Sequence, residues 1–155
     1  MDRSFGAVAP PLYLTTTFTF AGYEQAREYD YTRAGNPSRA MLADTIAQLK
    51  GGAGAVITSG GMAAVDLVLG MLGGDDLVLA PHDSYGGTYR LLAARAAKRQ
   101  FNVAFVEQAD EAALSAALKA KPALVLIETP SNPLMRVVDV RAIAVREGGR
   151  SEGRR

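Results

Sequence analysis

The sequence contains no cysteine, and its only histidine is His82. Without cysteine there can be no disulfide, no thiolate nucleophile and no thiolate metal site. With one histidine, a His-rich metal cluster and a local Ser/His/Asp triad are both implausible. His82 lies between an expected strand and an expected helix, where a lone histidine is more often a hydrogen-bonded structural residue than a catalytic one.

Long apolar runs and a charge excess are also missing. No run approaches the roughly 20 apolar residues of a membrane-spanning helix, and the first residues do not follow a basic-then-apolar signal pattern. The 17 Lys and Arg residues nearly balance the 16 Asp and Glu residues, so no global field favours nucleic acid or an anionic membrane. We therefore expect a cytoplasmic protein with no membrane or nucleic-acid partner.

The 155 residues correspond to about one domain, in which helical and strand patterns alternate after residue 36. Asn36 and Pro37 form a helix-opening signal, and Gly51 and Gly52 form a stop signal, so a helix is expected from Asn36 to Lys50. Apolar periodicity predicts the later elements. These are strands at Ala53–Thr58, Leu77–Ala80, Val103–Val106 and Ala123–Glu128, and helices at Met62–Leu72, Tyr89–Arg99, Glu111–Ala120 (capped by Asp110) and from Asp139 through Ile143.

The expected strands are short, continuous apolar runs, which is typical of strands covered on both faces. With helices between them, right-handed crossovers and a mainly parallel sheet follow. The fold class is therefore α/β, a three-layer αβα arrangement. In such a sheet the ligand site lies outside the carboxyl ends of the strands, so chemistry is expected in the loops after each strand.

Residues 1–35 read as an extended arm that ends in a polar motif. Leu12–Phe20 is rich in β-formers without helical period, and a segment of this kind has no core of its own. In the motif Tyr29–Arg39, the guanidinium of Arg33 and the hydroxyl of Tyr31 could hold one anion together. The alternative, on spacing alone, is a solvated polar loop.

Two loops after expected strands could also hold a ligand. Ser59-Gly60-Gly61-Met62 leads straight into a helix, where free amides and the positive helix end suit a phosphate, although Gly-Gly is also common in an ordinary turn. Tyr85 begins another helix, where its ring could stack on a planar ligand or simply pack in the core. Neither a Walker-type motif nor Gly-x-Gly-x-x-Gly is present, which argues against familiar nucleotide sites.

Four motifs occur in the order of a known family: Tyr-Asp-Tyr-Thr-Arg-x-Gly-Asn-Pro-Ser, Ser-Gly-Gly-Met, His-Asp-Ser-Tyr-Gly-Gly-Thr-Tyr-Arg and Glu-Thr-Pro-Ser-Asn-Pro-Leu. The chain resembles the Cys/Met-metabolism pyridoxal-phosphate (PLP) enzymes over about residues 2 to 144, and within them the cystathionine γ-synthases. The resemblance implies the PLP-dependent transferase fold of type I. It also implies PLP as cofactor and a homo-oligomer, a tetramer in the family.

The resemblance assigns four residues to the cofactor within one subunit. Gly61 and Met62 would offer backbone amides to the phosphate, Tyr85 would stack on the pyridine ring, and Asn132 would bond its phenolic oxygen. The Schiff-base lysine of the family has no counterpart among these 155 residues, so no catalytic residue is assigned and the chain alone is expected to be inactive.

Other residues are assigned to a neighbouring subunit's cofactor or to the substrate. Tyr31 and Arg33 would reach the phosphate of a neighbour, Arg90 would help hold the substrate, and Asp30 could contact the amino group of the incoming amino acid. Ala34 stands where some relatives have a basic residue thought to hold a succinyl group, so the acyl group of the donor is left open.

The implied reaction is γ-replacement on an O-acylhomoserine by cysteine, giving cystathionine in methionine biosynthesis. A related cystathionine lyase or an O-acylhomoserine sulfhydrylase is the first alternative. A non-catalytic assembly fragment that docks on homologous subunits through residues 1–39, and a remnant that folds poorly, are further ones.

The expected organisation has three parts: an inter-subunit arm at residues 1–35, the first part of the PLP-binding domain at 36–144, and a tail at 145–155 unlike the family. From Arg146 the chain is rich in Gly and Arg without apolar period or strand pattern, so we expect this tail to be disordered. An interrupted or shifted reading frame would explain it.

Overall fold

The structure of the protein is a computed structural model that describes residues 6–148. The chain divides into two compact units between Ser59 and Gly60. We call them the N-terminal unit and the C-terminal unit and describe each by itself. The proposed division into an arm at 1–35, a domain at 36–144 and a tail stays a prediction.

The N-terminal unit consists of an extended segment and helix α1 (Pro37–Lys50). The extended segment folds back on itself at an isolated antiparallel bridge between Thr17 and Tyr31. The Asn36 side chain accepts a hydrogen bond from the Ser38 amide and so caps α1, with Pro37 in the first turn. Gly51 ends the helix in the left-handed region at φ 65°, where glycine is favoured. The predicted helix and both of its end signals are confirmed.

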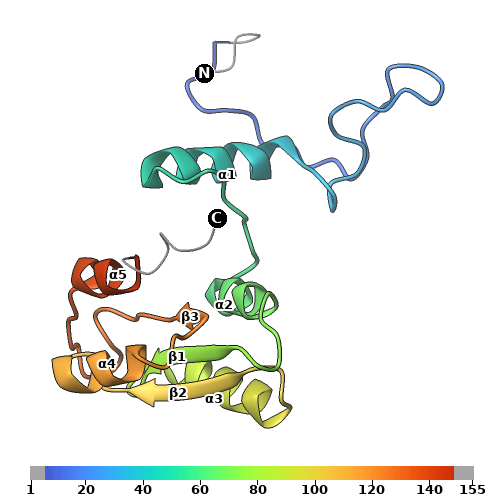
Figure 1. Ribbon diagram of the computed structural model, residues 1–155. Helices are drawn as coiled ribbons and strands as arrows, with labels where there is room; N and C mark the ends of the chain where they lie inside the picture. The colour runs from blue at the N-terminus through green and yellow to red at the C-terminus, as the bar shows by residue number, and fades with distance from the viewer. Residues whose placement is uncertain (1–5, 149–155) are drawn as a thin grey trace. The chain divides into compact units, whose positions relative to one another are not determined.

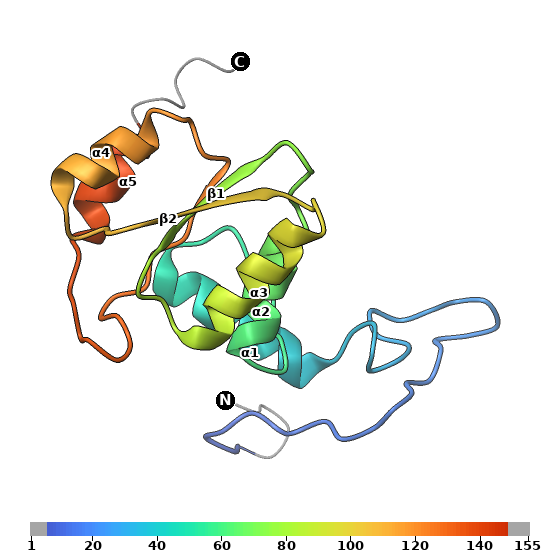
Figure 2. The same ribbon diagram turned by 90° about the horizontal axis from the view of Figure 1, so that it is seen from below.

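The C-terminal unit is built on a parallel sheet of β1 (Leu77–Pro81), β2 (Asn102–Val106) and β3 (Leu124–Val125) in the order β2-β1-β3. Its helices are α2 (Gly61–Leu69), α3 (Gly86–Ala97), α4 (Glu111–Leu118) and α5 (Val140–Gly148). Figures 1 and 2 show this unit in two views, with β1 between its two neighbours.

Helices cover both faces of the sheet. Val78 and Ala80 point to one face and form a core with Leu69 of α2 and Leu92 of α3. Leu79 points to the other face and packs with Leu114 and Leu118 of α4 and Ile143 of α5. All three of these β1 side chains are fully buried, as expected for a central strand without polar alternation. The predicted three-layer αβα architecture is confirmed.

One predicted strand is wrong. Ala53–Thr58 is irregular backbone in the structure and does not pair with the sheet of the C-terminal unit. Instead Ala55, Val56 and Ile57 line a cavity of about 230 Å³ beside α1. The β propensity of the segment is real, but propensity alone does not make a sheet.

Several further boundaries differ from the sequence predictions: α2 ends at Leu69, α3 begins at Gly86, and β3 and α5 differ as well. Strand β3 covers only Leu124–Val125, although amides on either side still donate to β1. Helix α5 begins after Asp139, whose carboxylate accepts from the Ala142 amide as expected of a cap, but it continues past Ile143 to Gly148. The disorder expected for the tail at residues 145–155 is therefore wrong for residues 145–148, which belong to α5. The remainder of that tail lies outside the described residues.

None of the helices in residues 6–148 combines the length and the apolar composition of a membrane span.

Candidate functional site

The start of helix α2 holds the first candidate group. Gly60 is the N-cap in extended backbone, and no side chain caps this helix, which lies wholly within the described part of the chain. A Cβ built on Gly60 or Gly61 would meet nothing within 4 Å, so open space lies over this helix end. Gly61 and Met62 are therefore exposed in the first turn, where backbone amides and the positive helix end favour an anion.

The start of helix α3 lies next to the start of α2. The Thr88 hydroxyl contacts the Met62 sulfur at 3.8 Å, which brings the first turns of the two helices together. Further along, Arg95 Nη2 pairs with Asp66 Oδ1 at 2.8 Å, so the helices are joined at a second point. The beginnings of α2 and α3 thus form one surface.

Tyr85 is the N-cap of α3, and its side chain is 49% exposed. A Cβ added at Gly87 would come within 2.5 Å of the Tyr85 ring, so this position must be glycine for the ring to lie where it does. A Cβ at Gly86 would likewise lie 3.2 Å from the Arg90 guanidinium. The absence of side chains at Gly86 and Gly87 therefore leaves room for the Arg90 guanidinium and the Tyr85 ring at the helix start. The ring is exposed and available to a ligand.

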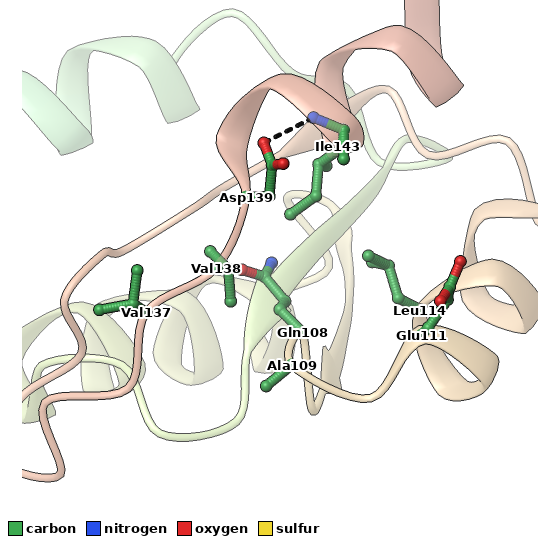
Figure 3. A pocket seen from close by; sticks show the side chains of 9 residues that line it. Gln108, Ala109, Glu111, Leu114, Val137, Val138, Asp139 and Ile143 are labelled. Carbon is green, nitrogen blue, oxygen red and sulfur yellow. Dashed lines mark hydrogen bonds between the residues drawn. The ribbon is translucent and has the colours of Figure 1, made fainter.

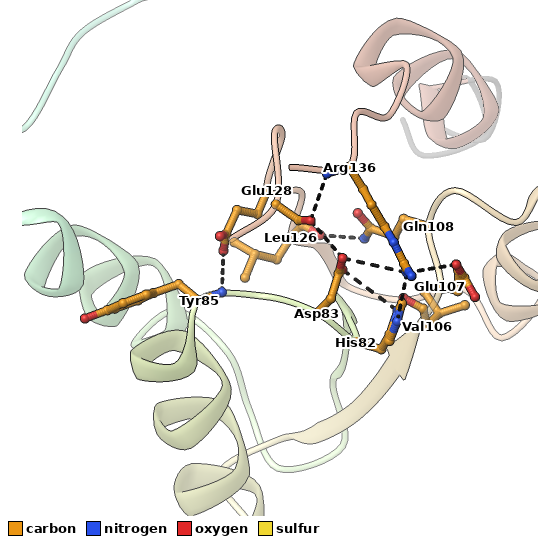
Figure 4. A network of polar contacts seen from close by, with 10 residues as sticks. His82, Asp83, Tyr85, Val106, Glu107, Gln108, Leu126, Glu128 and Arg136 are labelled. Carbon is orange, nitrogen blue, oxygen red and sulfur yellow. Dashed lines mark hydrogen bonds and ion pairs between the residues drawn. The ribbon is translucent and has the colours of Figure 1, made fainter. Parts of the chain in front are cut away.

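The loop after β3 carries Asn132, which is exposed. This loop contacts the start of α3 through the Glu128 carboxylate, which accepts a hydrogen bond from the Tyr85 amide at 2.9 Å. Figure 4 shows the Glu128 carboxylate beside the Tyr85 backbone amide, with the Tyr85 ring pointing away from it. The start of α3 thus contacts both the start of α2 and the loop after β3 in the C-terminal unit. These three segments carry five of the predicted site residues, Gly61, Met62, Tyr85, Arg90 and Asn132.

A network of polar side chains joins the loops that follow β1, β2 and β3 (Figure 4). Arg136 Nη1 lies 2.9 Å from Glu107 Oε1, 3.3 Å from His82 Nε2 and 3.9 Å from Asp83 Oδ2. Asp83 Oδ2 also accepts from the Ser131 hydroxyl at 2.8 Å. The structural role expected for His82 agrees with its hydrogen-bonding distances to Arg136 and to the Val106 carbonyl, 3.4 Å from Nδ1.

Sequence reasoning did not single out Asp83, Glu128, Ser131 or Arg136. A signal was present, because Asp83 and Glu128 each follow a parallel strand of the same sheet. The carboxyl ends of such strands meet at one edge. Two carboxylates at that edge need donors, and the neighbouring loop supplies them.

The remaining predicted residues lie in the N-terminal unit. Tyr31 and Arg33 are both exposed, and the Arg33 guanidinium lies 5.0 Å from the centre of the Tyr31 ring, within cation–π range. Asp30 Oδ1 accepts from the Tyr31 amide at 2.6 Å. In the same segment, a hydrogen bond to the Glu28 side chain raises the pKa of Tyr29. The pair of Tyr31 and Arg33 thus presents a phenol and a guanidinium together to solvent.

A separate pocket of about 200 Å³ lies beside the starts of α4 and α5 (Figure 3). Leu114 and Ile143 form part of its apolar wall, and Gln108 Oε1 is buried beside it without a hydrogen-bond partner in the described chain. A water molecule donating to this oxygen would satisfy it. None of the predicted site residues lines this pocket.

A parallel sheet with an open helix start and an exposed tyrosine ring at its carboxyl edge defines an α/β protein suited to a phosphorylated ligand. The model of the family described as Cys/Met metabolism PLP-dependent enzyme matches residues 1–147, so the chain belongs to this family. The enzymes of the family depend on PLP.

Individual relatives agree with this assignment. The chain is 50% identical over 143 residues to cystathionine γ-synthase of Escherichia coli, a match that covers 92% of this chain and 37% of the relative. It is 39% identical to a cystathionine β-lyase of Lactococcus lactis subsp. cremoris, over 92% of this chain and 38% of that enzyme.

A solved structure of cystathionine γ-synthase from Xanthomonas oryzae pv. oryzae, in complex with aminoacrylate and cysteine, superposes with a TM-score of 0.89 at 46% identity. That match covers 96% of this chain and 38% of the other. The chain therefore spans a little over a third of the length of these relatives.

Proposed function

We propose that the C-terminal unit supplies part of the PLP site of a cystathionine γ-synthase. The reaction would replace the acyloxy group at the γ carbon of an O-acylhomoserine with the sulfur of cysteine, releasing the carboxylic acid and giving cystathionine for methionine biosynthesis in the cytoplasm. The observation that supports this best is the shared surface of the α2 start, the α3 start and the β3 loop. It occurs in a chain 50% identical to the Escherichia coli synthase.

The residues present fit this cofactor. The open start of α2 would hold the phosphate through the amides of Gly61 and Met62, since no side chain of the described residues caps that helix. The exposed Tyr85 ring would stack on the pyridine ring, and Asn132 would donate to its phenolic oxygen. When bound, PLP supplies the electron sink for the chemistry at the substrate carbons. The protein's part is to hold and orient the ring.

Arg90 would bind the substrate. Its guanidinium lies over Gly86 at the start of α3, beside Tyr85, and a guanidinium presents paired donors that match a carboxylate. A substrate amino acid held there would lie next to the stacked ring. Arg90 would therefore act by orientation.

Tyr31, Arg33 and Asp30 would serve a neighbouring subunit in a homotetramer. Tyr31 and Arg33 are exposed and already face one another, so the pair could close on an anion without losing much conformational freedom. Asp30 would then lie near the amino group of the incoming amino acid. The acyl group of the donor stays open, because Ala34 offers no charge to a distal carboxylate.

The 155 residues alone would be inactive. Their four lysines, Lys50, Lys98, Lys119 and Lys121, are all exposed, and none lies in a loop of the candidate site. A Schiff-base lysine is usually desolvated so that its amine is unprotonated. We propose that the lysine of the active enzyme comes from outside this chain.

Borohydride trapping tests this part of the proposal. The chain would be incubated with PLP, reduced with borohydride, and its modified lysines identified by mass spectrometry. We expect weak, non-saturating labelling spread over the exposed lysines. Stoichiometric labelling of a single lysine would show a competent Schiff-base site and contradict the proposal.

Co-expression with the full-length Escherichia coli synthase tests the subunit contact. A tagged chain should co-elute with the enzyme on size exclusion, and a variant with both Tyr31→Ala and Arg33→Ala should lower the PLP content of the mixed species. Co-elution with unchanged PLP content would favour the assembly fragment without a cofactor role. The lyase alternative has less support, since the match to a cystathionine β-lyase is 39% against 50%.

A further inference from the structure

Two hydrogen bonds join the loop after β1 to the loop after β3 in opposite directions. The Tyr85 amide, in the first loop, donates to Glu128 Oε2 at 2.9 Å. The Ser131 hydroxyl, in the second loop, donates to Asp83 Oδ2 at 2.8 Å. We call these two bonds the crossed pair, since each loop contributes one carboxylate and one donor (Figure 4).

The bond between Ser131 and Asp83 is sheltered from water, whereas the bond between Tyr85 and Glu128 is exposed. Ser131 is 3% exposed, the Asp83 side chain is 13% exposed, and Glu128 is half-buried. Hydrogen bonds to carboxylates are stronger than neutral ones, and burial increases the cost of losing a partner. The crossed pair therefore fixes the separation of the two loops.

The crossed pair ends directly at two proposed cofactor residues. One of its bonds is made by the backbone of Tyr85 itself, and the other by the residue next to Asn132. Asn132 lies in a short loop that is closed on itself, because the Ser131 amide donates to the Arg136 carbonyl at 2.9 Å and the Arg136 amide to the Ser131 hydroxyl at 3.2 Å. The position of Asn132 thus follows that of Ser131.

The space between these side chains is too small for a ligand. The cavity bounded by Asp83, Glu128, Ser131 and Arg136, among others, has a volume of only about 10 Å³, around the minimum for one water. These residues therefore act on the loops that they join and do not form a site of their own.

We propose that Asp83 and Glu128 are positioning residues that set the separation between Tyr85 and Asn132, and with it the recognition of the pyridine ring. This inference rests on the proposed function, because it concerns the same cofactor. It predicts that breaking the crossed pair weakens binding of the ring and leaves binding of the phosphate unchanged, since the amides of α2 are not part of it.

The ligand experiment compares two probes on the full 155-residue chain. Pyridoxine 5′-phosphate has the ring, the phenol and the phosphate but no aldehyde, so it cannot react with lysines. Inorganic phosphate reports on the anion-binding groups alone, which are the α2 start and the pair of Tyr31 and Arg33, and neither takes part in the crossed pair. Equilibrium dialysis of both probes would be carried out on Glu128→Ala, Ser131→Ala, the conservative variant Glu128→Gln, and the control Asp75→Ala, an exposed carboxylate in the turn before β1.

Glu128→Ala and Ser131→Ala should each lower the affinity for pyridoxine 5′-phosphate about 3- to 10-fold, as for one lost hydrogen bond, with phosphate affinity unchanged. Glu128→Gln keeps an acceptor for the Tyr85 amide and should stay within about twofold of the parent chain, as should Asp75→Ala. An equal loss of affinity for both probes, or an unchanged affinity for pyridoxine 5′-phosphate, would overturn the proposal.

A measurement without ligand distinguishes a failure of the crossed pair from a failure of the proposed function. In Ser131→Ala, exchange of the Tyr85 amide should be about 3- to 10-fold faster, although Tyr85 makes no bond to Ser131, because the loops move together. Unchanged exchange overturns the crossed pair whatever the ligand result. If the exchange is faster but the parent chain does not prefer pyridoxine 5′-phosphate to phosphate, the proposed function fails, and the positioning role fails with it.

Discussion

Replacing Gly87 with alanine should affect stability and ligand binding in opposite directions. The added Cβ would lie 2.5 Å from Cε1 of Tyr85, where about 3.4 Å is an ordinary contact, so the ring must move by roughly 0.9 Å. Since the ring is 49% exposed, it can rotate into solvent at little cost. Alanine in a helix is favoured over glycine by up to about 1 kcal/mol.

The free energy of unfolding of Gly87→Ala should therefore be unchanged or higher by up to about 1 kcal/mol in urea denaturation. Affinity for pyridoxine 5′-phosphate should fall about two- to twelvefold, the loss of an aromatic contact of about 0.5 to 1.5 kcal/mol. Gly61→Ala, whose Cβ meets nothing, is the control for the helix effect on stability. Full ring affinity in Gly87→Ala would refute the claim that Tyr85 stacks on the ring.

Other predictions concern stability and ionisation. Asn36→Ala should lower the free energy of unfolding by about 1 to 3 kcal/mol, because this buried side chain caps α1 and also donates two hydrogen bonds. Asn36→Asp keeps the cap and should lower the free energy of unfolding by less. Equal losses of stability in the two variants would contradict the capping role. A double-mutant cycle of Asp66 and Arg95 should give a coupling of about 0.2 to 1 kcal/mol that weakens with salt, and salt independence would argue against an exposed ion pair. Glu28→Gln should lower the pKa of Tyr29 toward its ordinary value, as followed by NMR titration. The neutral phenol that donates to Glu28 stabilises the fold below the ordinary pKa, and this contribution is lost as the pH rises through the raised pKa.

Local signals in the sequence predicted the helices well. The Asn36 cap and the Gly51 stop are short-range effects of backbone geometry, and the structure has both. The Asp110 cap of α4 is likewise present, with its carboxylate accepting from the Ala112 and Ala113 amides. Signals of this kind depend on a few adjacent residues and need no knowledge of the rest of the chain.

Strands and loop contacts were less predictable, because they depend on partners distant in the sequence. Ala53–Thr58 has strand composition but does not pair with the sheet of the described residues, and it is irregular. The bonds from Tyr85 to Glu128 and from Ser131 to Asp83 span 43 and 48 residues, a pairing that no local pattern encodes. The sequence motifs indicated where the loops lie, and only the folded structure showed that the loop after β1 is hydrogen-bonded to the loop after β3.

The central claim is that the C-terminal unit holds the phosphate and the ring of one cofactor at a single surface. Amide and side-chain NMR during a titration with pyridoxine 5′-phosphate tests it most directly. We predict saturable shifts that share one dissociation constant at Gly61, Met62, Tyr85 and Asn132. Shifts confined to the pocket lined by Gln108 and Ile143, or no saturable shift at the four residues, would contradict it.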